Sequence, residues 1–191
     1  MAKLAISAAI LAGGKSSRFG SDKALYPFRG KPLIAWVLES LAEVDDCFIV
    51  GPTAYHLPLA NYPDLEKYNY LGPLGGLYRA LKEAKHDWLA LVACDMPLLS
   101  KEYWALLDTA CEEGVQVVMG GSGGGLEPLA SLYHRSLLPL IESQLKAQKY
   151  SLLNLYEKAN SKVIPWHLIQ SQCPEHQFLN INYLADLASL G

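Results

Sequence analysis

The sequence lacks the features of a membrane, secreted or zinc-binding protein. No apolar run approaches the roughly 20 residues needed to cross a bilayer. Residues 1–11 are too short, and lead too directly into glycines, to resemble a signal peptide. We therefore expect a cytoplasmic protein, in which disulfides are not expected. No C-x-x-C spacing of zinc sites occurs among the four cysteines, which are Cys47, Cys94, Cys111 and Cys173.

Charge is also scarce, and several catalytic and phosphate-binding patterns are missing. Only 18% of the 191 residues are charged and the net charge is −3, which argues against a general nucleic-acid-binding protein. The sequence shows no Ser-His-Asp pattern, and its glycine-rich loop lacks both the G-K-[ST] ending of a P-loop and the G-x-G-x-x-G order. A hydrophobic fraction of 51% at this length predicts one folded domain over residues 1–191.

What the sequence does have is a loop of small residues and cations at residues 10–25. It follows an apolar run, residues 4–10, that predicts a buried strand. Gly13 and Gly14 let backbone N–H groups approach an anion without steric hindrance, and Arg18 and Lys23 add positive charge. Such a loop suits a nucleotide polyphosphate, whereas a Gly/Ser-rich surface turn is the alternative interpretation.

The pattern of apolar residues predicts an α/β fold. After Pro32, apolar residues at helical spacing predict a helix that ends at Asp45 and Asp46, and residues 47–50 predict a strand. This β-loop-α-β unit indicates a three-layer structure, in which a mostly parallel central sheet has helices on both faces. The continuous apolar run at 88–94 predicts a central strand of that sheet.

The remaining segments have weaker patterns. Residues 53–70 show little periodicity and predict a surface excursion with at most a short strand, either a binding loop or a connector. Residues 115–119 and 127–133 predict strands, and the glycine tract at 120–125 between them is either a mobile lid or a hairpin loop. Helices are expected from Ser100 onward, over 137–145 and within 146–160.

Three further segments contain candidate ligand-binding groups. Gly72-Pro73 turns the chain and Gly75-Gly76 opens a predicted helix, whose free N–H groups can face a ligand or whose small residues can serve close packing. Asp95 follows the predicted central strand, where open α/β sheets bind ligands, as a metal ligand or a turn residue. Asn180 and Asn182 share one face of an extended segment, or else form an Asx turn.

The motif L-A-G-G-x-S-x-R-x-G-x-D-K, from Leu11 to Lys23, closely resembles the signature loop of the molybdenum cofactor guanylyltransferase family. The segment at 72–76 is similar to that family's G-P-L-[AG]-G, and Cys94-Asp-Met-Pro to its C-D-[MT]-P. The segments starting at Glu127 and Phe178 resemble two further motifs of the family. The resemblance implies a Rossmann-like nucleotidyltransferase fold and transfer of GMP from GTP to the terminal phosphate of molybdopterin.

The resemblance also implies roles for individual residues. Arg18, Lys23 and Asp95 would be catalytic, with Asp95 holding Mg²⁺, and Asn180 and Asn182 would lie on the pterin side. The nucleotide would contact Leu11, Ala12, Gly13, Gly14, Lys23, Asn69, Gly72, Pro73, Leu74, Gly75 and Asp95. GTP and molybdopterin are the implied partners, with transient contact with molybdoenzymes or their chaperones.

The chain departs from the family pattern at the position expected to select guanine. Asn69 stands where guanine-selecting members usually have an aspartate, and an amide oxygen accepts only one of the two guanine N–H bonds. Asp64 and Glu66 are nearby acidic residues, and they are the candidates to replace the missing aspartate. The alternatives are a cytidylyltransferase for the same cofactor, a sugar-phosphate nucleotidyltransferase, and a non-catalytic nucleotide-binding partner of a molybdoenzyme chaperone.

Overall fold

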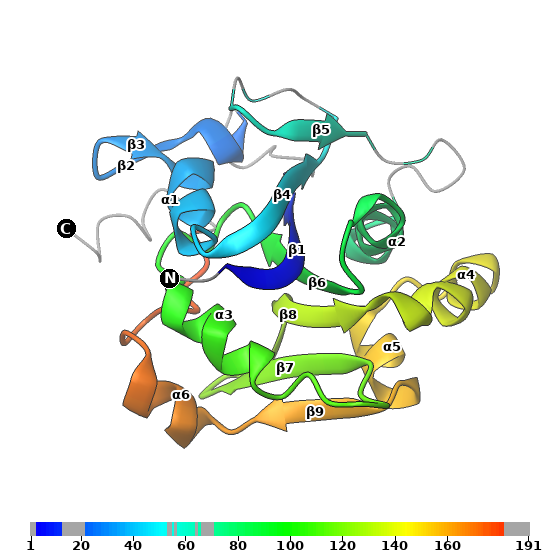
Figure 1. The fold of residues 1–191 in the computed structure, drawn as a ribbon. Helices are drawn as coiled ribbons and strands as arrows, with labels where there is room; N and C mark the ends of the chain where they lie inside the picture. Colours follow the sequence, from blue (N-terminus) through cyan, green and yellow to red (C-terminus); the bar gives the residue numbers. More distant parts are fainter. Residues whose placement is uncertain are drawn as a thin grey trace.

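A mostly parallel sheet forms the middle layer of the protein (Figure 1). The computed structural model describes residues 3–12, 22–52, 55, 57–63, 65 and 71–181. Within them the sheet has seven strands in the order β5-β4-β1-β6-β8-β7-β9. Their bounds are β1 Leu4–Leu11, β4 Val44–Val50, β5 Ala60–Tyr62, β6 Trp88–Ala93, β7 Val117–Ser122, β8 Gly125–His134 and β9 Ser161–Ile164. Strands β2 (Pro27–Phe28) and β3 (Lys31–Pro32) form a separate small hairpin.

The direction of the strands decides where a ligand site can form. Strand β1 is parallel to β4 and β6, and Leu11 pairs with both Val50 and Ala93, so the carboxyl ends of the three strands meet at one edge. Strand β8 is antiparallel to β6 and β7, and β9 is parallel to β7. The predicted strand at 88–94 is therefore confirmed as a central strand, with a parallel neighbour and an antiparallel one.

Helices cover both faces of the sheet, as predicted (Figure 1). Helices α1 (Leu33–Ser40), α3 (Lys101–Asp108) and α6 (Trp166–Gln172) pack on one face, where Ile34, Trp104 and Ile169 are buried. On the other face lie α2 (Pro73–Glu83), α4 (Leu138–Lys146) and α5 (Leu152–Lys158). The described residues also include the 3₁₀ turns η1 (Lys23–Leu25) and η3 (Arg135–Leu137). No helix in the described part of the chain combines the length and apolar character that a membrane crossing requires.

Two sequence predictions need correction near β4, namely the end of the preceding helix and the start of the strand. Asp45 and Asp46 do not end α1, which stops at Ser40, but lie inside β4, which begins at Val44. Asp46 is buried with 8% of its surface exposed, and two polar partners allow this burial. Ser7 Oγ donates a hydrogen bond to Asp46 Oδ2 over 2.9 Å, and Lys85 Nζ lies 2.9 Å from Oδ1. Burial opposes ionisation of Asp46, but these hydrogen bonds outweigh it and lower its pKa below 3.8.

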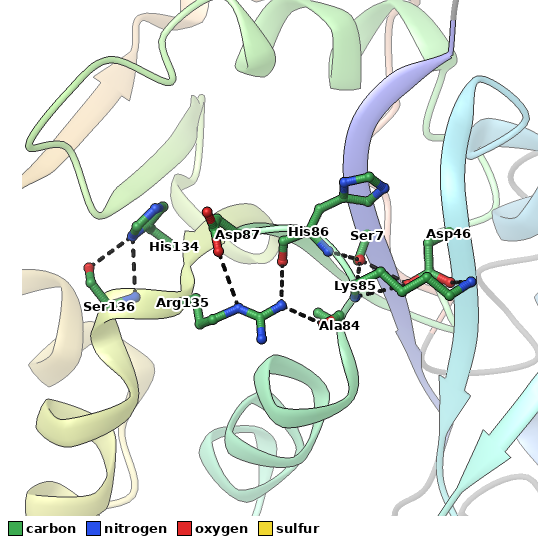
Figure 2. A network of polar contacts seen from close by, with 9 residues as sticks. All are labelled: Ser7, Asp46, Ala84, Lys85, His86, Asp87, His134, Arg135 and Ser136. Carbon is green, nitrogen blue, oxygen red and sulfur yellow. Dashed lines mark hydrogen bonds and ion pairs between the residues drawn. The ribbon is translucent and has the colours of Figure 1, made fainter.

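The same contacts attach the connection between α2 and β6 to its neighbours (Figure 2). Ser7 Oγ accepts hydrogen bonds from the backbone N–H groups of Lys85 at 3.0 Å and His86 at 3.1 Å. From the other side, Arg135 donates to the carbonyl oxygens of Ala84 and His86. The amino-terminal end of β6 is therefore held by β1 and by the end of β8.

The glycine tract at 120–125 belongs to the hairpin that joins β7 to β8. Ser122 pairs with Gly125 across the turn, so the hairpin alternative is confirmed. Two glycines of the tract are needed for packing and turn geometry. A Cβ at Gly120 would collide with the hydroxyl of Tyr103, and Gly125 has a φ of 134°.

Candidate active site

Lys23 and Asp95 form an ion pair at the carboxyl edge of the sheet. Asp95 directly follows β6 and Cys94, and Lys23 is the first residue of η1. Lys23 Nζ lies 2.5 Å from Asp95 Oδ2, although the two residues are 72 positions apart in the sequence. Their side chains are 16% and 19% exposed, so the pair sits at a partly buried position that a ligand can still reach.

Asp22 fixes the orientation of the turn that carries Lys23. Its Oδ1 accepts a hydrogen bond from the backbone N–H of Ala24 at 3.0 Å, and its carbonyl accepts from Leu25. Aspartate is a favoured residue at such a cap because it satisfies an N–H group that has no partner within the helix. The short turn therefore presents Lys23 in a defined direction.

One oxygen of Asp95 has no hydrogen-bond partner among the described residues. Oδ1 is buried and accepts no hydrogen bond from any residue that the structure describes. A buried acceptor left unpaired is unfavourable, by about 1–3 kcal/mol. Magnesium is usually bound through one or two carboxylates together with substrate phosphates, so this oxygen fits that ion. The described residues contain no cluster of three or more His, Cys, Asp or Glu side chains that would hold a metal unaided.

The thiol beside Asp95 remains protonated. Burial raises the pKa of Cys94 to about 12, and the negative charge of Asp95 adds to the effect. Because a metal ligand or nucleophile must be a thiolate, Cys94 does not compete with the Asp95 carboxylate.

Backbone from β1 and α2 lies at the same edge. The N–H of Cys94 donates to the carbonyl of Leu11 at 3.1 Å, and the N–H of Ala12 to that of Val50 at 2.9 Å. Helix α2 starts at Pro73, after Gly72 with a φ of 72°, a value that favours glycine. A Cβ at Gly76 would lie 2.8 Å from the Leu11 side chain, which shows how closely α2 packs against the end of β1.

The carboxyl-terminal segment also reaches this edge. The backbone N–H of Ile181 donates to the carbonyl oxygen of Asp95 at 3.0 Å. Asn180 precedes Ile181 and is partly exposed, and its side-chain amide donates a hydrogen bond to the carbonyl oxygen of Phe178 at 3.5 Å.

The structure thus gathers the predicted site residues that it describes at one edge. These residues are Leu11, Ala12, Lys23, Gly72, Pro73, Leu74, Gly75, Asp95 and Asn180. Leu74 and Gly75 are buried, whereas Gly72 and Pro73 are exposed, so the solvent-facing part of this segment is Gly72-Pro73. Gly13, Gly14, Arg18, Asn69 and Asn182 lie outside the described residues.

Two residues near the site were not predicted from the sequence. Tyr55 is buried at 6% exposure and donates a hydrogen bond from its hydroxyl to Asp22 Oδ2 at 3.0 Å. It comes from the segment without periodicity, so no spacing indicated it. Glu127 lies in β8, near the end that runs beside the carboxyl end of β6. Partial burial raises the pKa of Glu127, and a hydrogen bond from Ser122 only partly offsets this.

Comparisons with known proteins agree with this geometry. The family model described as MobA-like NTP transferase domain matches residues 8–163. A probable molybdenum cofactor guanylyltransferase of Deinococcus radiodurans is 39% identical over 190 residues, covering 98% of this chain and 94% of that protein. One from Bacillus licheniformis is 30% identical over 187 residues, covering 95% and 94%.

A solved structure shows the same fold. Molybdopterin-guanine dinucleotide biosynthesis protein A from Archaeoglobus fulgidus superposes with a TM-score of 0.83 at 24% identity, covering 96% of this chain and 95% of that one. The ion pair at the strand ends, the family match and the two relatives lead to one conclusion: the chain belongs to the MobA-like NTP transferase family and is a nucleotidyltransferase.

Proposed function

We propose that this enzyme transfers GMP from GTP to the terminal phosphate of molybdopterin. An oxygen of that phosphate bonds to the α-phosphorus of GTP, the bond from the α-phosphorus to the bridging oxygen breaks, and pyrophosphate leaves. The products are molybdopterin guanine dinucleotide and pyrophosphate. The names of the relatives support this substrate pair. The observation that carries the proposal is the Lys23–Asp95 pair at the edge where β1 and β6 end.

Asp95 is the residue that would hold Mg²⁺, because its buried Oδ1 has no partner among the described residues. When bound, Mg²⁺ neutralises phosphate charge and polarises the α-phosphate. Lys23 would then leave Asp95 and pair with the triphosphate, since its ammonium group is already at the edge. Arg18 would add a second positive charge to the same phosphates.

The residues of the chain act by positioning rather than by proton transfer. A phosphate monoester is already an anion near neutral pH, so the attacking group needs no general base. Backbone N–H groups at 11–14 and at the start of α2, over 72–75, would hold the nucleoside triphosphate. Asn180 and Asn182 would orient the acceptor, because their segment contacts Asp95 through Ile181. Positioning of this kind can supply several kcal/mol, on the order of 7–11, of the barrier reduction.

The wider proposal covers the whole chain and its setting. Residues 1–191 would form one nucleotidyltransferase domain that works in the cytoplasm. Its product would pass to molybdoenzymes or their chaperones during transient contact.

Base selectivity is the point at which alternatives must be separated. Asn69 offers an amide where an aspartate would accept two bonds from guanine, so a cytidylyltransferase or a sugar-phosphate nucleotidyltransferase is the competing function. The test is pyrophosphate release with molybdopterin, Mg²⁺ and each of GTP, CTP, UTP and ATP. We expect GTP to give the highest kcat/KM. Preferred turnover of CTP, or turnover only with a sugar phosphate as acceptor, would refute the proposed substrate pair.

A further inference from the structure

We propose that Tyr55 is a positioning residue for nucleotidyl transfer. In this proposal, its hydroxyl donates to Asp22 and lies against the carbonyl of Ala12, so that it sets the spacing of the two residues that flank the glycine-rich segment 13–21. Through Asp22 it also sets the position of Lys23 against Asp95. The inference rests on the proposed function in its choice of GTP and molybdopterin as the substrates of the test.

The contacts of the Tyr55 hydroxyl carry this inference. The hydroxyl oxygen lies 3.0 Å from Asp22 Oδ2 and 3.4 Å from the carbonyl oxygen of Ala12. A hydroxyl has one proton to donate, and the shorter contact is to a carboxylate, which is the stronger acceptor. The hydrogen bond is therefore to Asp22, and the Ala12 carbonyl oxygen lies close to the hydroxyl without taking its proton.

The ring of Tyr55 cannot move away easily. It is buried at 6% exposure in the core cluster on the α1 side of the sheet, together with Ala12 and Ala24. Side chains in a close-packed core occupy defined rotamers. The hydroxyl is thus presented from a fixed position to both flanking residues.

Each flanking residue is itself held in place. Ala12 donates its N–H to Val50 at 2.9 Å, and its carbonyl packs so closely on Gly51 that a Cβ there would overlap it. Asp22 uses its second oxygen, Oδ1, to cap η1 at Ala24. Because each carboxylate oxygen of Asp22 accepts a hydrogen bond, this residue links Tyr55 to η1.

The next contact in this series is the catalytic pair. Lys23 follows Asp22 directly, opens η1 and reaches Asp95 at 2.5 Å. A series of contacts therefore runs from the end of β1 through Tyr55 and Asp22 to Lys23. A misplacement of about 1 Å in a reacting group can lower a rate roughly a hundredfold. Tyr55 lies 33 positions from Asp22 in the sequence. Removal of its hydroxyl should nevertheless misplace Lys23 relative to the triphosphate and lower the rate of transfer.

The test compares Tyr55→Phe with Asp22→Asn, the double variant and the control Tyr150→Phe. Phenylalanine keeps the buried ring and removes only the hydroxyl. Tyr150 is 38% exposed and follows α4, far along the chain from the site. The measurements are steady-state kinetics for GTP and for molybdopterin, the Kd of GTP with Mg²⁺ by calorimetry, and the urea midpoint of unfolding.

We expect Tyr55→Phe to lower kcat/KM for GTP by about 10- to 100-fold. The KM for molybdopterin and the urea midpoint should stay close to those of Tyr150→Phe. The double variant should be no worse than the more impaired single variant, because both changes break the same contact. A purely structural role would instead shift the urea midpoint and leave the ratio of the two KM values unchanged.

Two results would overturn the inference. One is a Tyr55→Phe enzyme within twofold of Tyr150→Phe in kcat/KM and in the Kd of GTP. The other is a double variant in which the two losses multiply. Failure of the proposed function looks different, since the wild type itself would then not transfer GMP to molybdopterin. In that case, the Kd of the most tightly bound nucleotide is compared between the wild type and the variants. This comparison decides the role of Tyr55 without an acceptor.

Discussion

The backbone N–H of Ile181 donates to the carbonyl oxygen of Asp95, which brings the carboxyl-terminal segment against the strand end that carries the proposed metal ligand. We predict that Asn180→Ala raises the KM for molybdopterin about tenfold, the equivalent of one or two lost hydrogen bonds. The KM for GTP should change by less than twofold, and steady-state kinetics with each substrate varied measures both. Gln170→Ala, an exposed amide on α6, is the matched control. An equal effect on both KM values would contradict the acceptor role.

Lys23→Ala should lower kcat/KM for GTP more than kcat/KM for the acceptor. Without the ammonium group, the triphosphate loses a charged partner, and we expect kcat/KM for GTP to fall at least about a hundredfold. Lys158→Ala, on the exposed end of α5, controls for the loss of one positive charge. The comparison is made at constant ionic strength, with added Mg²⁺ and after its removal by a chelator. Activity that persists at the same level after chelation would argue against the divalent ion.

Ser7→Ala should lower stability without changing catalysis. Ser7 is fully buried, and its loss leaves the N–H of His86 without its acceptor, while the N–H of Lys85 keeps only a 3.4 Å contact with Asp46 Oδ2 (Figure 2). An unpaired buried donor costs about 1–3 kcal/mol, so the free energy of unfolding should drop by that amount or more. Urea unfolding measures it, with the exposed Ser171→Ala as control. A loss of kcat larger than twofold in the folded variant would show that this end of β6 is coupled to the site.

Stability should also depend on pH through Asp46. Its pKa is lowered in the folded protein, because the hydrogen bonds from Lys85 and Ser7 outweigh the effect of burial. A depressed carboxyl pKa contributes stability that is present above its ordinary value, 3.8, and lost as the pH falls through the folded value. The wild type should therefore lose more stability than Asp46→Asn between pH 5 and acid conditions of about pH 2. If urea unfolding shows that the two proteins lose the same free energy of unfolding over this range, the assignment is contradicted.

Local sequence pattern was enough to predict the fold wherever burial is apolar. The run at 88–94 is apolar throughout because its strand is covered on both faces, and it appears as β6. The paired carboxylates Asp45 and Asp46 resembled the end of a helix because such residues usually face solvent. Their place in β4 depends on Ser7, 39 positions from Asp46, and no local pattern contains that contact.

The candidate site was likewise predicted only in part from the sequence. The glycine motif and the C-D-M-P string predicted the roles of Lys23 and Asp95 through resemblance to a family, whereas their contact is a result of the fold. Tyr55 stands in a segment without periodicity, and its importance arises only from its hydroxyl contacts with Asp22 and Ala12. Glu127 was predicted as a strand residue, and only the antiparallel pairing of β8 with β6 places it near the site.

The central claim is that Asp95 serves a nucleoside triphosphate at the carboxyl edge of the sheet. Its most direct test is transfer of label from α-phosphate-labelled GTP to molybdopterin by wild type, by Asp95→Asn and by Asp87→Asn, an exposed aspartate at the opposite end of β6. We predict that the wild type and Asp87→Asn form labelled dinucleotide at similar rates. Asp95→Asn should be slower by at least about a hundredfold while its unfolding transition stays cooperative. An Asp95→Asn enzyme that transfers label at a near-normal rate would contradict the account.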